Sequence, residues 1–202
     1  MSTFELPIMC AVFVLAASAL CAVPLEVLKG DQPPENAIWV DSLKIERGYN
    51  DAMYKPRPGV STKGNPITIN GEVFKHGYGT RAHSLLAIDL KGLAEKLVVA
   101  VGIDDEVEQG SVVFEVHADG RKIADSGVMR KGDGPKILTA DLTGVRRMWL
   151  MVTDAGDGNL TGNADWGGAL IYLKPGADSG RIDTVKLPLE GETLQVASTD
   201  FK

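Results

Sequence analysis

The strongest constraint on the fold is an alternation of apolar and polar residues with a period of two. In the segment SVVFEVHADGRKIADSG, residues 111–127, one face would carry Val112, Phe114, Val116 and Ala118. The opposite face would carry Val113, Glu115, His117 and Asp119. Successive side chains of a strand point to opposite faces, and Asp-Gly is a typical two-residue hairpin turn. We therefore predict a β-hairpin whose apolar face lies on the core.

Other strand candidates follow at short intervals. The segment RRMWLMVTD, residues 146–154, also alternates, whereas KLVVAVGID, residues 96–104, is almost wholly apolar and predicts a strand covered on both faces. Clusters of Gly, Asp and Asn separate further candidates, which are PITIN, EVFKHG, LLAIDL, KILTADL and GGALIYL. Many short strands with turn signals between them predict an all-β fold, a β-sandwich of the jelly-roll type.

The first 22 residues have the pattern of a secretory signal peptide. They carry one charged residue, Glu5, and an apolar run that ends in small residues, so we expect the mature chain to begin at Val23. The segment lacks the usual basic residue before the run, which leaves an uncleaved anchor, or a lipid anchor on Cys21, as alternatives. Cys10 and Cys21 both lie here, so cysteine catalysis is excluded for the remaining chain. We expect a secreted or extracytoplasmic protein.

The apolar pattern also divides the chain. We assign residues 23–35 to a linker, 36–174 to one β-sandwich domain and 175–202 to a tail or an extra strand. The formal net charge is -6 without a basic cluster. Nothing in this balance favours nucleic acid as a partner, or strong membrane association after signal cleavage.

Five segments, taken in order, resemble the successive motifs of the NPCBM family, the family-51 carbohydrate-binding modules. They are WVDSLKIERGYNDAMYKP, PITINGEVFKHGYGTRAHS, VVAVGIDDEV, GSVVFEVHADGRKIADSGVM and VTDAGDGNLTGNADWGGA. The resemblance implies a galactose-binding, discoidin-like β-sandwich that accompanies secreted glycoside hydrolases, binds galactose-containing glycans and commonly carries structural calcium. It also implies a possible protein partner that carries a catalytic domain.

The chain departs from the family pattern at two positions. Arg81 stands where the family usually has the histidine of G-x-G-T-H-A, with His83 two positions later, and Asn163 stands where D-H-A-D-W has its histidine. If those histidines contact the ligand in relatives, the implied preference for galactose is in question for this chain.

A sugar site combines an aromatic face with polar groups that form directional hydrogen bonds. Trp166 and Tyr78 are the candidates for the aromatic platform, although Trp166 equally suits the core. Gly77 and Gly79, on either side of Tyr78, favour a tight turn over close approach of a ligand. The candidate hydrogen-bonding residues lie in HGYGTRAHS and NADWGG, and they are His76, Arg81, His83, Asn163 and Asp165.

Two acidic loops are candidates for calcium, which prefers six to eight oxygen ligands. The candidate ligands are Asp104, Asp105, Asp154 and Asp157. Acidic loops are also commonly just solvated, and carbonyl groups near ERGYND are another possible source of ligands.

The sequence gives no support for catalysis. It has no G-x-S-x-G or H-E-x-x-H motif, and no motif singles out a pair of carboxylates for glycoside hydrolysis. We therefore predict a non-catalytic carbohydrate-binding module. The alternative is a β-sandwich that has lost sugar binding and acts as a protein-interaction or adaptor domain.

Overall fold

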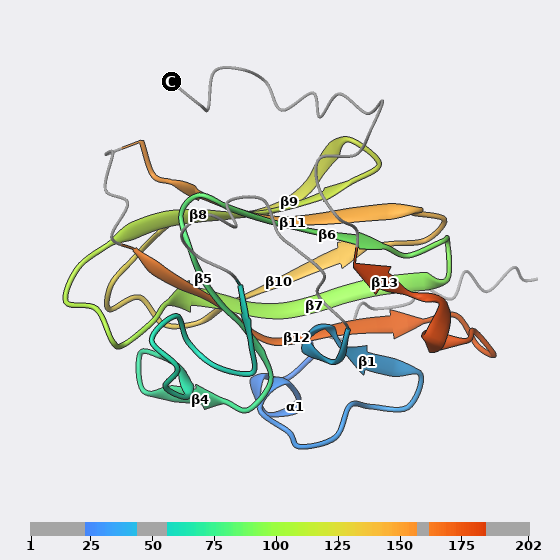
Figure 1. Cartoon of the computed structure of the whole chain (residues 1–202), viewed down its shortest axis with the longest axis horizontal. Helices are drawn as coiled ribbons and strands as arrows, with labels where there is room; N and C mark the ends of the chain where they lie inside the picture. Colours follow the sequence, from blue (N-terminus) through green and yellow to red (C-terminus); the bar gives the residue numbers. More distant parts are fainter. Residues whose placement is uncertain (1–22, 44–55, 157–161, 185–202) are drawn as a thin grey trace, which may run out of the picture.

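Two antiparallel sheets lie face to face in a computed structural model of the chain, which describes residues 23–43, 56–156 and 162–184 (Figure 1). Among these residues, sheet A has six strands and sheet B has five, and helical segments are short. This confirms the all-β sandwich expected from the period of two.

Sheet A forms the lower layer in Figure 1. Its strands run in the order β10 (Lys136–Asp141), β7 (Ala94–Ile103), β12 (Asn163–Leu173), β5 (Gly77–Arg81) and β2 (Arg57–Pro58), and β1 (Ala37–Trp39) also pairs with β12. The outer face of this sheet is covered by α1 (Leu25–Leu28) and by the hairpin of β3 (Ile67–Ile69) and β4 (Glu72–Phe74).

Sheet B forms the upper layer. Its strands run in the order β13 (Asp183–Thr184), β6 (Ser84–Asp89), β11 (Arg147–Asp154), β8 (Ser111–Ala118) and β9 (Arg121–Arg130). Two short 3-10 turns, η1 (Val40–Ser42) and η2 (Ser179–Arg181), complete the described elements. The predicted hairpin is β8–β9, and Asp119 and Gly120 both adopt positive φ at its turn, as the type I′ geometry requires.

The core lies between the two sheets. Phe114 and Val116 of β8 point into it, as the alternation predicts. Strand β7 is covered on both faces, because Val99 faces the core while Val98 faces the cluster beneath α1 and the β3–β4 hairpin. Its unbroken apolar sequence follows from this double burial.

Two segments differ from their predicted roles. Residues 23–35, expected to be a linker, contain α1, whose Leu28 is fully buried against sheet A. Residues 77–81, expected to be a tight turn, form strand β5, which lies between β12 and β2 in sheet A. Its glycines serve close packing, because a Cβ on Gly79 would lie 2.4 Å from the Val60 carbonyl oxygen.

The ends of the chain are only partly covered by the description. Residues 175–184 contain η2 and β13, so part of the predicted tail is an extra strand. The predicted signal segment and the TLQVAS strand lie outside the described residues. In the described ranges, the helices are too short to cross a bilayer.

Candidate functional site

A hydrogen-bonded polar network lies where β5 ends and β12 begins. Arg81 and Asn163 are register partners across these two strands, and Arg81 Nη2 donates a 3.1 Å hydrogen bond to Asn163 Oδ1. Asn163 Nδ2 in turn donates to Glu106 Oε1 at 2.7 Å. Asn163 is buried, whereas Arg81 and Glu106 are partly exposed. We call these three residues the polar end network.

Glu106 connects the network to the loop that precedes β3. Its carboxylate accepts hydrogen bonds from Ser61 Oγ at 2.7 Å, Thr62 Oγ1 at 2.9 Å and Asn65 Nδ2 at 3.1 Å. The Lys63 backbone N–H donates to the same group at 3.2 Å. Burial by itself would raise the pKa of Glu106, but these hydrogen bonds outweigh it and hold the pKa below its ordinary value. Glu106 is therefore an ionised anchor that fixes the loop.

Glu106 and its partners in the loop are not among the residues predicted from the sequence. Glu106 lies in GIDDEVEQG, directly after β7, where its neighbours Asp104 and Asp105 drew attention as calcium candidates. Its partners at positions 61–65 are about forty residues away, and no pattern in the sequence links the two loops.

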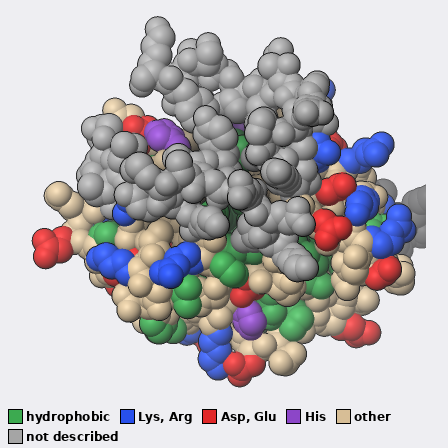
Figure 2. All heavy atoms as spheres, in the orientation of Figure 1, with side chains coloured by type: hydrophobic (Ala, Val, Ile, Leu, Met, Phe, Trp, Pro, Cys, Tyr) green, Lys and Arg blue, Asp and Glu red, His purple; other side chains and the backbone are tan. Residues whose placement is uncertain are grey.

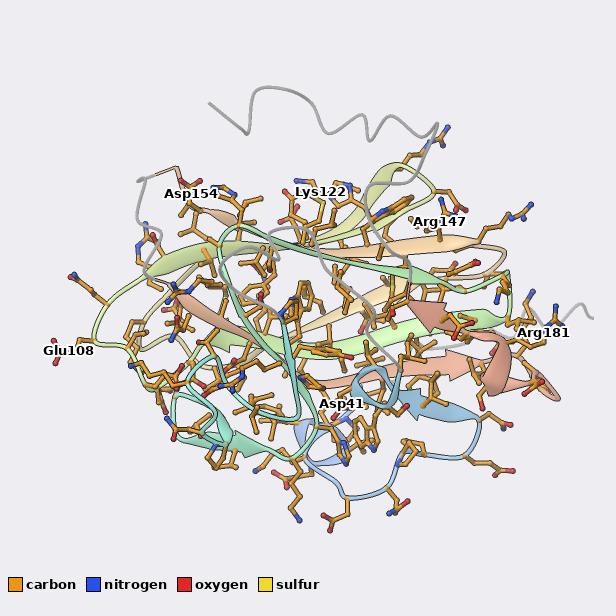
Figure 3. The ribbon with its side chains drawn as sticks, viewed as in Figure 1. Asp41, Glu108, Lys122, Arg147, Asp154 and Arg181 are labelled. Atoms are coloured by element: carbon orange, nitrogen blue, oxygen red, sulfur yellow. The ribbon has the colours of Figure 1, made fainter. Side chains whose placement is uncertain are left out.

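His83 and Asp154 lie at the same end of the sandwich. His83 follows Arg81 by two residues, and its Nε2 atom is 4.0 Å from Asp154 Oδ1, with both side chains partly exposed. Figure 3 shows Asp154 at the end of the sandwich that also carries Glu108, opposite the end that carries Arg181. The structure thus joins Arg81, Asn163 and Glu106 in one network and places His83 beside Asp154 as a separate pair.

The two predicted aromatic platforms are buried, so this part of the prediction is wrong. Tyr78 is 1% exposed and its hydroxyl donates a 3.0 Å hydrogen bond to the Val40 carbonyl oxygen. Trp166 is 3% exposed and packs edge-to-face on Phe114, with ring centroids 5.0 Å apart. Neither ring can present its face to a sugar. The alternation of β12 and β5 turns both rings into the core.

His76 lies away from the polar end network. It precedes β5, whereas Arg81 ends it, and an extended strand rises about 3.3 Å per residue, so the two are separated by the length of the strand. Its ring stacks on Trp39 at 4.5 Å between centroids, and its Nδ1 atom is 3.1 Å from Asp41 Oδ2. His76 therefore joins β5 to the η1 region and is not part of the candidate site.

Asp165 is buried beneath the site instead of lining it. Neither of its carboxylate oxygens has a hydrogen-bond partner among the described residues. Burial is the main cause that raises its pKa well above the ordinary range, and the neighbouring carboxylate of Asp104 raises it further. Asp165 and the buried Asp104 therefore form a carboxyl pair that favours a protonated state of Asp165.

Two of the calcium candidates, Asp104 and Asp105, accept hydrogen bonds from neighbouring loops. Asp104 accepts hydrogen bonds from the Thr68 and Glu106 backbone N–H groups, at 3.2 and 2.7 Å. Asp105 accepts from the Asn70 and Gly71 backbone and from Lys131. Within the described ranges, no group of three or more His, Asp or Glu side chains is arranged to hold a metal ion. Asp157 lies outside these ranges, so calcium binding stays a prediction.

The surface charge is mixed. Figure 2 shows acidic and basic side chains interspersed around the described rim of this face, without a large area of one sign. This agrees with the modest negative net charge of the chain.

The fold and its loop-bearing end define a carbohydrate-binding module of the β-sandwich class, a non-catalytic accessory module of glycoside hydrolases. The chain belongs to the NPCBM/NEW2 domain family, whose model matches residues 36–171.

Solved structures agree with this membership. The CBM51 module of a Clostridium perfringens GH95 protein, determined in complex with methyl-galactose, is 28% identical to the chain with a TM-score of 0.61, over 67% of this chain and 99% of that one. The CBM51-2 module of C. perfringens ZmpB, determined with GlcNAc, is 27% identical with a TM-score of 0.61, over 68% of this chain and 31% of that one.

Among curated proteins, alpha-1,3-galactosidase B of Akkermansia muciniphila is 33% identical over 105 residues, which make up 50% of this chain and 13% of that protein. A second curated relative is matched over only 7% of its length. The chain thus spans a small part of the length of these curated relatives.

Proposed function

We propose that the chain binds the terminal galactose-type residue of a glycan at the polar end network. The observation that carries this proposal is the hydrogen-bonded series Arg81–Asn163–Glu106, which holds a planar guanidinium at the partly exposed end of the sandwich. A relative of 28% identity that was solved with methyl-galactose supports the choice of sugar.

Binding would rest on directional hydrogen bonds. The guanidinium donates along fixed directions and can engage two neighbouring hydroxyl groups, while the His83 ring adds a donor or acceptor at the rim. Because Asn163 and Glu106 fix Arg81 before the sugar arrives, little side-chain entropy is lost on binding. A sugar exchanges hydrogen bonds with water for hydrogen bonds with protein, so we expect a micromolar to millimolar dissociation constant.

The proposal includes the setting in which binding occurs. The pattern of residues 1–22 supports a secreted or extracytoplasmic location. The curated relative is named as a galactosidase, which supports a role beside a catalytic domain, either covalently linked or on a partner. Weak single sites gain useful retention when several act together.

A glycan array of the folded chain tests this function, run with added calcium and again with EDTA. The test variants are Arg81→Ala and Arg81→Lys, because lysine keeps the charge but loses the planar fork. Lys122→Ala on β9, an exposed residue of another strand, is the matched control. We expect selective galactoside binding that both Arg81 variants lose and the control keeps.

Two results would count against the proposal. A folded chain that binds no glycan under either condition would favour the protein-interaction domain, an alternative that the burial of Tyr78 and Trp166 supports. If Arg81→Ala still binds galactosides, the proposed function would stand, but the binding site would lie elsewhere in the chain. Loss of binding in EDTA would support a calcium requirement.

A further inference from the structure

The face of sheet B that points away from sheet A carries an apolar strip. It consists of Leu85 and Ala87 on β6 and of Trp149 and Met151 on β11, and we call it the outer strip. Trp149 pairs with Ala87 and Met151 pairs with Leu85, so the four side chains stand together on one face. Each is at most 6% exposed. Two strands are thus apolar on both faces.

The outer strip has a sharp boundary. On the next strand, β8, His117 stands opposite Trp149 and Glu115 stands opposite Met151. Glu115 pairs with His117 at 2.7 Å and with Lys122 of β9 at 3.1 Å. Figure 3 shows Lys122 and Arg147 on this outer side of the sheet. The apolar area is therefore confined to β6 and β11, beside the β13 edge.

An apolar area that contains a tryptophan requires a cover. The outer face of sheet A is covered by α1 and the β3–β4 hairpin, but no helix or strand of the described ranges lies over the outer strip (Figure 1). Left open, such a patch promotes association. The low exposure of its four residues nevertheless marks the face as one that is buried in the folded chain.

The pairing of strand β13 indicates which segment covers the outer strip. It pairs antiparallel with β6, with Asp183 opposite Asp89 and Thr184 opposite Ile88, and Thr184 is buried on the core side as Ile88 is. If the pairing continued in this register, Val185 would lie opposite Ala87 and Leu187 would lie opposite Leu85. Because alternate residues face opposite sides, both would share the face of the outer strip.

We propose that the outer strip is the docking surface for residues 185–202 of the same chain, which reach it by extending β13 along β6. The sequence fits this face, because Val185, Leu187 and Leu189 alternate with Lys186 and Pro188. Pro188 is compatible with an outermost strand, which does not need every backbone N–H for pairing. The segment is longer than the six residues of β6 and can return over Trp149 after this pairing.

The proposed cover lies outside the residues that the family model matches. The family model ends at residue 171, before η2, β13 and the docking segment begin. The segment would protect both the outer strip and the open edge of β6, which otherwise presents unpaired backbone groups to other chains.

Disulfide trapping in the full chain tests the register directly. In a Cys10→Ser, Cys21→Ser background, Ala87→Cys with Val185→Cys places two thiols on neighbouring positions of the same face. Ala87→Cys with Lys186→Cys is the matched control, because residue 186 would point to the opposite face. We expect the first pair to form an intramolecular disulfide at least tenfold faster under mild oxidation, measured by mass spectrometry.

Two outcomes of the trapping would overturn the proposal. Equal rates for both pairs would contradict the register, and a disulfide between two chains would assign the strip to a second copy. If the Ala87→Cys, Val185→Cys variant forms no disulfide although its circular dichroism spectrum matches that of the parent protein, the proposal is also contradicted.

The environment of Trp149 gives an independent readout. Leu187→Asp should shift the tryptophan emission to longer wavelength and increase its quenching by acrylamide, because water would reach the indole ring. The same substitution in a Trp149→Phe background should leave emission unchanged. Unchanged quenching in Leu187→Asp would show that the segment does not lie over the strip.

Discussion

Arg81 and Asn163 face each other across the pairing of β5 with β12, and a 3.1 Å hydrogen bond joins the guanidinium to the side-chain amide. The amide nitrogen is already used by Glu106, which determines the orientation of the amide. Strand pairing, amide orientation and loop anchoring thus act on the same arginine. Arg81 and Glu106 therefore hold the Asn163 amide from two sides.

Asn163→Ala should weaken galactoside binding about tenfold or more and lower the free energy of unfolding by about 1–3 kcal/mol, since two partly buried hydrogen bonds are lost. Isothermal titration and urea unfolding measure the two effects. Asn163→Asp keeps the acceptor for Arg81 but sets a carboxylate against Glu106, so it should be less stable than Asn163→Ala. Wild-type affinity in the alanine variant would exclude the polar end network from binding.

Glu106→Gln should destabilise the chain by about 2 kcal/mol at pH 7, because charge-assisted hydrogen bonds become neutral ones. The pKa of Glu106 is lowered in the folded state, so its contribution is present above the unfolded pKa and disappears as pH falls through the folded pKa. Urea unfolding from pH 7 to pH 3 should show the difference from wild type shrinking below about pH 4. A difference independent of pH would contradict an ionised anchor.

Asp165→Asn should stabilise the chain at neutral pH, because an uncharged amide replaces a buried carboxyl beside Asp104. Here the folded-state pKa is raised, so the wild type is at its best below the unfolded pKa and loses stability as pH rises towards the folded pKa. The advantage of the variant should therefore be largest at pH 7 and vanish near pH 4 in denaturant titrations. A variant that is less stable at every pH would show that the carboxylate has an unseen cationic partner.

Tyr78→Phe should cost about 1–2 kcal/mol in the free energy of unfolding, because the buried Val40 carbonyl loses its hydrogen bond. Glycan affinity should stay within twofold of wild type, since the ring lies in the core. Chemical denaturation and a binding titration on the same sample separate the two effects. If Tyr78→Phe loses glycan binding while its stability is unchanged, Tyr78 would have to be part of the binding site.

Gly79→Ala should unfold the domain or cost several kcal/mol, because the new Cβ would lie 2.5 Å from Ser61 Cα and no flexible side chain can yield. Gly71→Ala is the matched control: its φ is +82° but nothing lies within 4 Å, so only about 1 kcal/mol of backbone strain is expected. Thermal unfolding compares the pair. Similar melting temperatures would contradict the close approach of β5 to the loop at positions 60–61.

The sequence predicted the parts of the fold that a local pattern determines. The alternation in residues 111–118 and the Asp119-Gly120 turn specify β8 and β9, and the unbroken apolar run specifies the doubly covered β7. Strand β5 was predicted as a turn because its glycines are required by close contacts with residues distant in sequence. A local sequence pattern does not contain that information.

The candidate site was predicted only in part, for the same reason. Arg81 and Asn163 lie opposite each other, whereas His83 pairs with Asp154, and sugar contact by any of them stays a prediction. The exposure of an aromatic ring depends on which face of its strand meets the opposite sheet, and Trp166 and Tyr78 turned inward. Glu106 is important only through a loop distant in sequence.

Leu28 lies so close to sheet A that a Cβ on Gly168 would come within 2.1 Å of its carbonyl oxygen. Its side chain belongs to the cluster that includes Phe74 and Leu170, yet it precedes the family match, which begins at residue 36. The packed domain of this chain therefore extends beyond the residues that the family model matches. A module transplanted at the family boundaries would leave behind a buried leucine, whose loss costs about 2–5 kcal/mol in comparable cores.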